Sequence, residues 1–406
     1  MIKFNMVFSK QAKSNYKYWF LCLMNKREIF LLGSIFILTA CSSPKVSTTV
    51  SLQEPVLQLL DVYEIPFQTM FQQTKVGGLS SIDYNLEEDV YYLISDDRSA
   101  FNPARYYKAS IRIRHNKIED ITFISADTLR RYDGSMFPSF ANDPFQCPDP
   151  ESLRFLSTTN QFIWANEGER LINHEKPILL DPAIYISNQN GQVTDSFKIP
   201  SIFKMNPVEK GPRRNGTFES LSLNKHLNML YACMEEPLFE DGERAGLHDS
   251  TAWVRMIKFD IETKDPVIQY AYKIDPVVHK PNPENAFRVN GVSEILYAGN
   301  KRMIVVERSW SAGQKPSNVK VYLADHAEAS DVSSIKSLTG VGFTPVKKKL
   351  LIDMDKLGIH IDNIEGVTFG PRLSNGNPSL LFVSDNNFNK EQVSQLLLFE
   401  LKNFSE

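Results

Sequence analysis

Carboxylate side chains recur along this 406-residue sequence at a nearly constant interval. Four short motifs place a glutamate before a small or apolar residue, and a fifth has serine there; these residues are Ser80, Glu151, Glu219, Glu294 and Glu365. The positions lie 68 to 75 residues apart, and from each one a polar turn and an apolar stretch lead to a second acid. A period this regular is typical of a repeat architecture.

The second acids, at which the apolar stretches end, are Asp96, Glu167, Glu235, Glu307 and Asp385. With the motif glutamates they make nine candidates for one acidic site. Two carboxylates about 4 Å apart repel by about 4 kcal/mol at an effective dielectric of about 20. A ring of them therefore requires protonation, arginine partners or a hard cation.

We predict that part of this ring holds a metal ion. Oxygen ligands favour Ca²⁺ or Mg²⁺ over zinc, and the seven histidines show no metal-ligand spacing. Ca²⁺ is the predicted cofactor. The predicted metal ligands are Asp96, Glu167, Glu219, Glu365 and Asp385. Glu219, Glu365 and Asp385 are also the predicted catalytic residues, acting as ligands or as the general base.

Arginines stand next to several of the acids or in nearby loops. We predict that Arg98, Arg105 and Arg308 bind an anionic substrate, together with Asn386. The alternative is a structural network in which acids, arginines and backbone amides tie the repeats together. In that case the ring has no chemistry of its own.

Each repeat must contain strands that carry these acids to one place. Four repeats each show four strand-like segments, and the fifth shows three before the sequence stops. The missing strand is predicted at 55–65, ahead of the first repeat. In a β-propeller an amino-terminal strand often completes the last blade and so removes an open edge.

We therefore predict an all-β fold, a β-propeller of five long four-stranded blades whose last blade is closed by the amino-terminal strand. Six blades are the alternative, if an insertion hides a weak blade. A two-sheet sandwich does not account for the period. Because the first strand of each propeller blade lines the central axis, the acids are expected to converge at one mouth.

The amino terminus differs from the rest of the chain. An apolar run at 29–40 follows Lys26 and Arg27, and as a helix it would rise only about 18 Å, too short to cross a bilayer. A basic flank before a short apolar run indicates a secretory signal. Residues 38–41 resemble a bacterial lipobox, so we predict lipidation of Cys41.

This assignment divides the chain into three parts. Residues 1–40 are an amino-terminal extension and lipoprotein signal peptide, with Met24 as the predicted true start; 41–54 are a tether, and 55–406 form the propeller. The protein is then expected in the cell envelope, at the outer membrane if the cell is Gram-negative. There Cys147 and Cys233 either form a disulfide or remain buried thiols.

Other chemistries are not supported. The sequence contains no Gly-x-Ser-x-Gly elbow, no His-Glu-x-x-His and no phosphate-binding Gly-x-x-x-x-Gly-Lys loop. The net charge of −3 gives no reason to expect nucleic acid as a partner. Contact with a membrane is expected through the lipid anchor only, and the oligomeric state stays open.

Several segments resemble the bacterial family described as "esterase-like activity of phytase". The opening Gly-Gly-Leu-Ser-Ser-Ile-Asp-Tyr carries this resemblance, which spans about residues 76–401; the matching segments are 77–84, 91–98, 103–107, 149–152, 214–220, 294–296, 306–308, 363–366 and 384–388. One departure is that Glu151 and Glu219 precede serine, where the family usually has glycine.

The resemblance implies a secreted or envelope propeller that hydrolyses phosphate or carboxylic esters. The favoured function is metal-assisted hydrolysis of a phosphate ester at the propeller mouth, with a small anionic ester as substrate. Two alternatives stay open. One is a non-catalytic binding or scaffold propeller with a structural acid–arginine ring, and the other is a lactonase or carboxylesterase.

Overall fold

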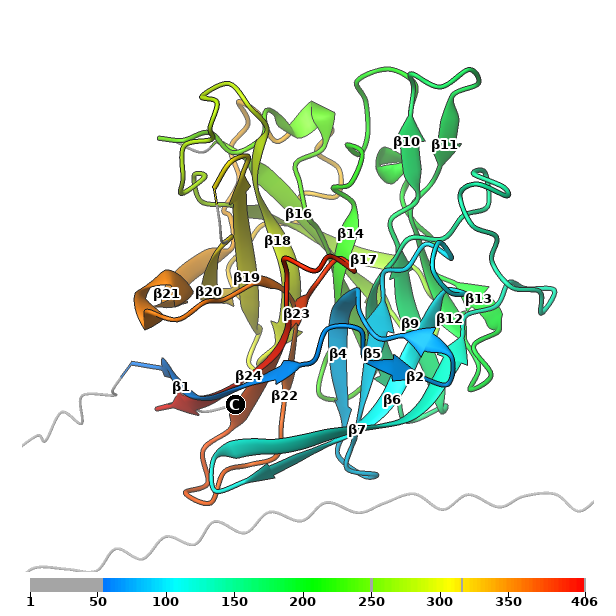
Figure 1. Ribbon diagram of the computed structural model, residues 1–406. Helices are drawn as coiled ribbons and strands as arrows, with labels where there is room; N and C mark the ends of the chain where they lie inside the picture. The colour runs from blue at the N-terminus through cyan, green and yellow to red at the C-terminus, as the bar shows by residue number, and fades with distance from the viewer. Residues whose placement is uncertain (1–53, 249–250, 315–316, 405–406) are drawn as a thin grey trace, which may run out of the picture. The chain divides into compact units, whose positions relative to one another are not determined.

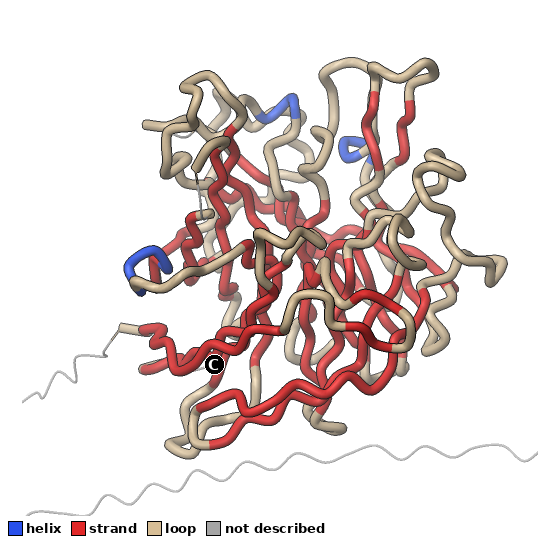
Figure 2. Tube along the Cα trace, in the orientation of Figure 1, coloured by secondary structure: helices blue, strands red, loops and turns tan. Residues whose placement is uncertain are grey.

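Each repeat folds as one antiparallel sheet. The computed structural model describes residues 54–248, 251–314 and 317–404. Within these ranges the regular elements are β-strands and three short 3-10 helices, η1 (Ser201–Phe203), η2 (Phe239–Asp241) and η3 (Met354–Leu357) (Figures 1 and 2). The strands form five four-stranded sheets and two small two-stranded ones. The predicted five-bladed β-propeller is confirmed, and the six-bladed alternative is wrong.

The blades follow one another along the chain. Blade 1 has β4 (Leu79–Asn85), β5 (Val90–Ser95), β6 (Arg105–Arg114) and β7 (Lys117–Thr128). Blade 2 has β8 (Pro150–Leu156), β9 (Gln161–Asn166), β12 (Ala183–Ser187) and β13 (Val193–Ser196). Blade 3 has β14 (Phe218–Leu223), β15 (Met229–Met234), β16 (Trp253–Asp260) and β17 (Pro266–Lys273). Blade 4 has β18 (Arg288–Tyr297), β19 (Arg302–Ser311), β20 (Asn318–Asp325) and β21 (Lys347–Asp353).

Blade 5 combines the two ends of the described chain. It consists of β22 (Asn363–Phe369), β23 (Ser379–Asp385), β24 (Ser394–Lys402) and the amino-terminal β1 (Val56–Ile65). β1 runs antiparallel to β24 along its whole length (Figure 1). It buries Leu57 and Ile65 and covers an edge that would otherwise be open. The predicted closure by an amino-terminal strand is confirmed.

The innermost strands form a closed ring. β4, β8, β14, β18 and β22 contact one another in this order, and β22 contacts β4 again. Two small hairpins lie outside the blades, β2 (Met70–Phe71) with β3 (Thr74–Lys75), and β10 (Glu169–Leu171) with β11 (Ile178–Leu180). None of the described residues forms a helix long and apolar enough to span a membrane. The predicted signal peptide, Met24, Cys41 and most of the tether lie outside the described residues.

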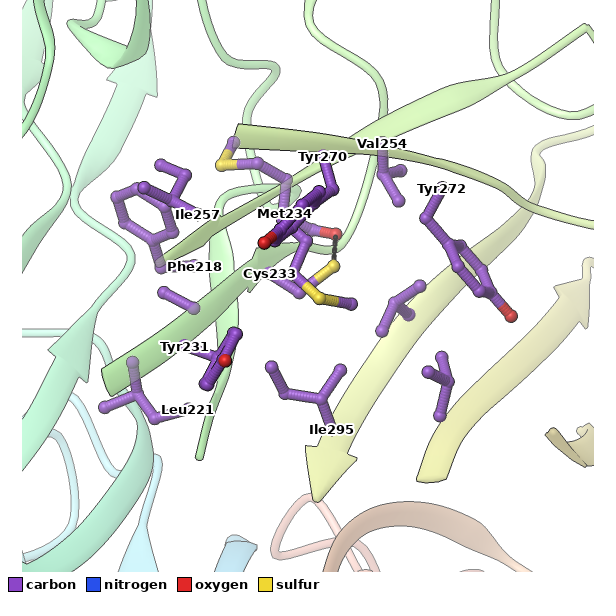
Figure 3. Close-up of a cluster of buried hydrophobic side chains, with 14 of the residues drawn as sticks. Phe218, Leu221, Tyr231, Cys233, Met234, Val254, Ile257, Tyr270, Tyr272 and Ile295 are labelled. Atoms are coloured by element: carbon purple, nitrogen blue, oxygen red, sulfur yellow. Dashed lines mark hydrogen bonds between the residues drawn. The ribbon is translucent and has the colours of Figure 1, made fainter. Parts of the chain in front are cut away.

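Apolar side chains fill the space between neighbouring blades. One cluster packs Phe218, Cys233 and Tyr272 of blade 3 against Ile295 of blade 4 (Figure 3). The Cys233 thiol donates to the carbonyl oxygen of Met234 at 3.4 Å. Cys147 is likewise buried, and both cysteines are free thiols. The alternative of a disulfide between them is therefore wrong.

The long connection between β20 and β21 reaches back to blade 3. The amide of Val332 donates to the carbonyl oxygen of Gln269 at 2.9 Å, and the amide of Val346 donates to that of Ala271 at 3.0 Å. These bonds cover part of the outer edge of β17. The connection thus protects a sheet edge of the neighbouring blade, rather than forming an extra blade.

Candidate active site at the propeller mouth

A β-bulge interrupts each innermost strand. In β14 the register shifts between Phe218 and Ser220, so Glu219 has no partner across the sheet. The same shift isolates Glu365 in β22. A bulge turns one side chain away from the regular pleat. Both carboxylates therefore line the cavity at this end of the ring.

Blade 4 differs from the sequence prediction by one residue. Its register shift falls between Val292 and Glu294, so Ser293 has the bulge position and Glu294 lies one step deeper, paired with Val306. There Glu294 accepts a hydrogen bond from the Ser81 hydroxyl at 3.1 Å and forms an ion pair with Arg154 at 2.6 Å. Grouping Glu294 with the mouth acids was wrong, because its carboxylate belongs to a buried interblade pair.

The same offset moves the second acid of blade 4. Met234 lies opposite Phe218 and Glu307 lies opposite Val292, so Arg308 takes the place that Glu235 has in blade 3. Glu307 is buried between blades 3 and 4 and accepts from the Tyr272 hydroxyl of β17 at 2.8 Å. Glu307 is thus not part of the ring, and an arginine stands among the acids that follow the second strands.

Arg308 lies at the centre of the acidic ring. Its guanidinium lies 2.6 Å from a Glu365 oxygen, 3.1 Å from a Glu235 oxygen and 3.8 Å from a Glu219 oxygen. It also donates to the Asn363 side chain. The cavity around it has a volume of about 720 Å³. Its acidic lining comprises Asp96, Glu151, Glu219, Glu235, Glu236, Asp362, Glu365 and Glu391.

Two other predicted substrate-binding residues lie elsewhere. Arg105 is 1% exposed, and its guanidinium donates to Asp97 at 2.8 Å and to the carbonyl oxygen of Lys75 at 2.7 Å. The Asn386 side chain accepts from the amides of Gly78 and Phe388. The structure uses both to order the loops beside Asp96 and Asp385, and neither lines the cavity.

Arg98 lies beside a second acidic group next to the ring. Its guanidinium is 3.2 Å from Glu169 and 3.4 Å from Asp149. Arg214, which lines the cavity, holds the other Glu169 oxygen at 2.8 Å. The sequence prediction omitted Asp149, although Asp149 stands two residues before the motif glutamate of repeat two.

Burial raises the pKa of the mouth carboxyls and so makes them weaker acids than exposed ones. It raises the pKa of Asp385, and the nearby Asp96 and Glu365 raise that pKa further. It also raises the pKa of Glu219, next to Glu235 and Glu167, while Arg308 opposes this rise. For Asp149, burial outweighs Arg98 and raises the pKa to about 7. The acidic ring at the mouth therefore contains more carboxyl groups than its arginines can neutralise.

The donor set fits a hard cation. One oxygen from each of Asp149, Glu151 and Glu167 lies within 4.8 Å of the others, and so does one from each of Glu167, Glu219 and Glu235. Among the described side chains, Asp385 also has a buried oxygen, Oδ2, with no hydrogen-bond partner. Oxygen-only ligands in this number suit Ca²⁺ or Mg²⁺. The clusters could therefore hold a metal ion, with Glu167 common to both triads.

These pKa values predict how stability depends on pH. A carboxyl whose pKa is raised from 4.5 to about 7, as in Glu236, keeps its proton in the folded chain while the unfolded chain has lost it. In the presence of a chelator, the free energy of unfolding should thus fall as pH rises from about 4.5 to about 7. Each such carboxyl should lower it by up to about 1.4 kcal/mol for every pH unit. Adding Ca²⁺ above pH 7 should restore it. Thermal denaturation across this range measures both effects, and a melting temperature that rises with pH in chelator contradicts the prediction.

One family profile matches most of the chain. It is named Phytase-like and described as esterase-like activity of phytase, and it matches residues 74–388. This range contains four complete blades and the two inner strands of blade 5. No curated protein sequence matches the chain.

Solved structures resemble the chain only in fold. A hydrazine synthase from Kuenenia stuttgartiensis has 10% identity and a TM-score of 0.33, over 75% of this chain and 64% of that one. A periplasmic gluconolactonase from Pseudomonas aeruginosa has 10% identity and a TM-score of 0.34, over 80% and 86%. A GH43 β-1,3-galactosidase has 10% identity and a TM-score of 0.45, over 83% and 94%. These values carry no information about the reaction.

Proposed function

Since the chain belongs to the phytase-like family described as having esterase-like activity, we propose that it is a hydrolase of phosphate esters, assisted by a hard cation at the propeller mouth. The cation proposed is Ca²⁺. The proposed substrate is a small anionic ester that enters the cavity of about 720 Å³ around Arg308.

One observation carries this proposal, the imbalance of charge at the mouth. Elsewhere in the described chain, buried acids have matched cations, as in the Asp241–Arg255 pair. At the mouth, Arg308 alone serves Glu219, Glu235 and Glu365. Asp385 retains a buried oxygen without a partner. A purely structural network gains nothing from such a surplus, whereas a cation site requires it.

In this proposal the residues of the mouth have different roles. The cation would be held by the carboxylates of the two triads, Glu167, Glu219 and Glu235 with Asp149 and Glu151. Asp96 and Asp385 add further carboxylates beside these ligands. When bound, the cation supplies Lewis-acid polarisation of the ester and a lower pKa for an attacking water. Arg308 orients the anionic group of the substrate. Glu365, whose pKa burial raises, accepts a proton from water.

We further propose that the protein works in the cell envelope. The lipobox-like residues 38–41 and the apolar run before them support this placement. Acylation of Cys41 would hold the propeller at the outer membrane if the cell is Gram-negative. An extracytoplasmic enzyme would also meet Ca²⁺ at concentrations that weak extracellular sites require.

A panel of esters tests the proposal against its two alternatives. The protein is assayed with Ca²⁺ or with chelator on p-nitrophenyl phosphate, phytate, p-nitrophenyl acetate and a lactone. We expect Ca²⁺-dependent release of phosphate, lost in Glu365→Gln. Turnover of only the acetate or the lactone would favour the carboxylesterase or lactonase. No turnover of any ester, with Glu365→Gln changing only the melting temperature, would favour the scaffold.

A further inference from the structure

Blade 4 extends further at the mouth than blade 3. β18 and β19 each have 10 residues, whereas β14 and β15 each have 6. The added residues of blade 4 pair Arg288 with Ser311 and Val289 with Trp310, beyond the position of Arg308. The extended strands therefore form a wall that rises past the acidic ring.

This wall presents aromatic rings to the cavity. Arg308 and Trp310 are two residues apart on β19, so both side chains point to the same side of the sheet, about 7 Å apart along the strand. Phe287 lies next to Trp310, with ring centroids 6.0 Å apart and planes tilted by 41°. Both rings line the cavity, and Trp310 is 40% and Phe287 53% exposed.

The surroundings hold the rings in place. Val289 stands directly across the sheet from Trp310. The Arg244 guanidinium lies 5.4 Å from the centroid of the Phe287 ring, and Glu236 pairs with that guanidinium. Large apolar side chains left exposed inside a polar cavity mark a ligand contact. A flat ligand ring would gain both apolar burial and stacking there.

We propose that the substrate carries a flat apolar ring face that stacks on Trp310 while its ester group lies at the acids beside Arg308. This inference rests on the proposed hydrolase function and specifies its substrate class. The face is that of an aromatic ring or of a sugar ring. A ring with a phosphate on every carbon presents no such face, and its charge would be repelled by the acidic lining. The preferred substrate is therefore a ring-bearing monoester.

Paired substrates separate the ring contact from the ester chemistry. Phenyl phosphate is compared with ethyl phosphate, and glucose 6-phosphate with glycerol 3-phosphate, in wild type, Trp310→Ala and Trp310→Phe. We expect Trp310→Ala to raise KM about tenfold for ring esters and to leave kcat and the KM for chain esters unchanged. Trp310→Phe should restore most of the loss. The affected pair identifies the ring as aromatic or sugar. Equal KM changes for ring and chain esters, or none for ring esters, would overturn the proposal.

A binding measurement keeps the inference separate from the hydrolase proposal. Phenylphosphonate, which cannot be hydrolysed, should quench tryptophan fluorescence in wild type and in Trp253→Phe, but not in Trp310→Phe. Trp253 is a matched control because its ring packs against Phe343 at 5.0 Å and does not line the cavity. Such quenching without any turnover would uphold the ring contact and reject the hydrolase. Absence of quenching, with KM unchanged in Trp310→Ala, would reject the ring contact and leave the hydrolase standing.

Discussion

Replacing Arg308 with methionine is expected to reduce phosphate release at least about 10²-fold and to lower the free energy of unfolding by about 3–5 kcal/mol at neutral pH. The Arg308 side chain is 17% exposed and contacts carboxylates from blades 3 and 5. Methionine keeps much of its length but removes the only cation that the described structure places between Glu235 and Glu365. Urea denaturation and initial rates of phosphate release measure the two losses.

Two controls show whether charge is responsible. Arg308→Lys keeps the charge and should recover part of the stability but little of the activity, since lysine lacks the planar fork whose two nitrogens reach Glu365 and Glu235. The stability loss of Arg308→Met should shrink as the pH is lowered, because burial raises the pKa of Glu219 and of Glu365, and the protonated carboxyls need no cation partner. An Arg308→Met protein as stable and as active as wild type at pH 7 would contradict this role.

Replacing Arg255 with methionine is expected to lower the free energy of unfolding by about 3–5 kcal/mol without affecting turnover by the folded protein. Arg255 is fully buried and contacts both oxygens of Asp241, at 2.6 and 2.9 Å. It also donates to the carbonyl oxygens of Val332 and Ile335. One side chain thus fastens the β20–β21 connection onto blade 3, and its loss leaves Asp241 buried and uncompensated.

The control for this variant is Lys273→Met at the exposed end of β17. A surface change of this kind usually stays within about 0.5 kcal/mol. Chemical denaturation of the three proteins at neutral pH gives the comparison. If Arg255→Met unfolds at the same denaturant concentration as wild type, the connection is not held by this pair.

The fold could be predicted from the sequence because its signals are local and repeated. Apolar stretches of strand length recur with one period, and each ends on a polar residue near the mouth. The orphan segment at 55–65 was the one strand missing from an otherwise complete set. Closure of blade 5 by β1 follows from that count, since an open sheet edge is avoided.

The site was predicted less well, for a reason that blade 4 makes clear. The sequence pattern aligns Glu294 with the motif glutamates, yet the bulge falls at Ser293. A shift of one residue sends a strand side chain to the opposite face. A signal was present, because motif and second acid are 13 residues apart in repeat four and 16 in the first three. Counting from Ser293 to Arg308 gives 15.

Side-chain contacts made by the loops beside the strands lie beyond the repeat pattern. The sequence suggested that Arg105 faces the substrate, but the loop fold turns its guanidinium toward Asp97. Asp149 stands two residues before the motif glutamate, but repeats one, three, four and five have no equivalent acid, so the repeat pattern did not select it; it meets Glu151 and Glu167 once blade 2 has folded. The second triad joins Glu167 of repeat two to Glu219 and Glu235 of repeat three. The closed propeller brings these side chains together, and the sequence of one repeat does not show which residues of the next repeat they will meet.

Calcium binding to the metal-free protein, measured by titration calorimetry, is the most direct test of the claim that the mouth carboxylates form a cation site. We expect wild type to bind Ca²⁺ with release of protons, because carboxyls such as Asp149, with its pKa raised to about 7, must ionise. Glu167→Gln removes the residue common to both triads and should abolish this heat, whereas Glu88→Gln on the surface should not. No calcium heat in wild type, or equal heat in Glu167→Gln, would contradict the account.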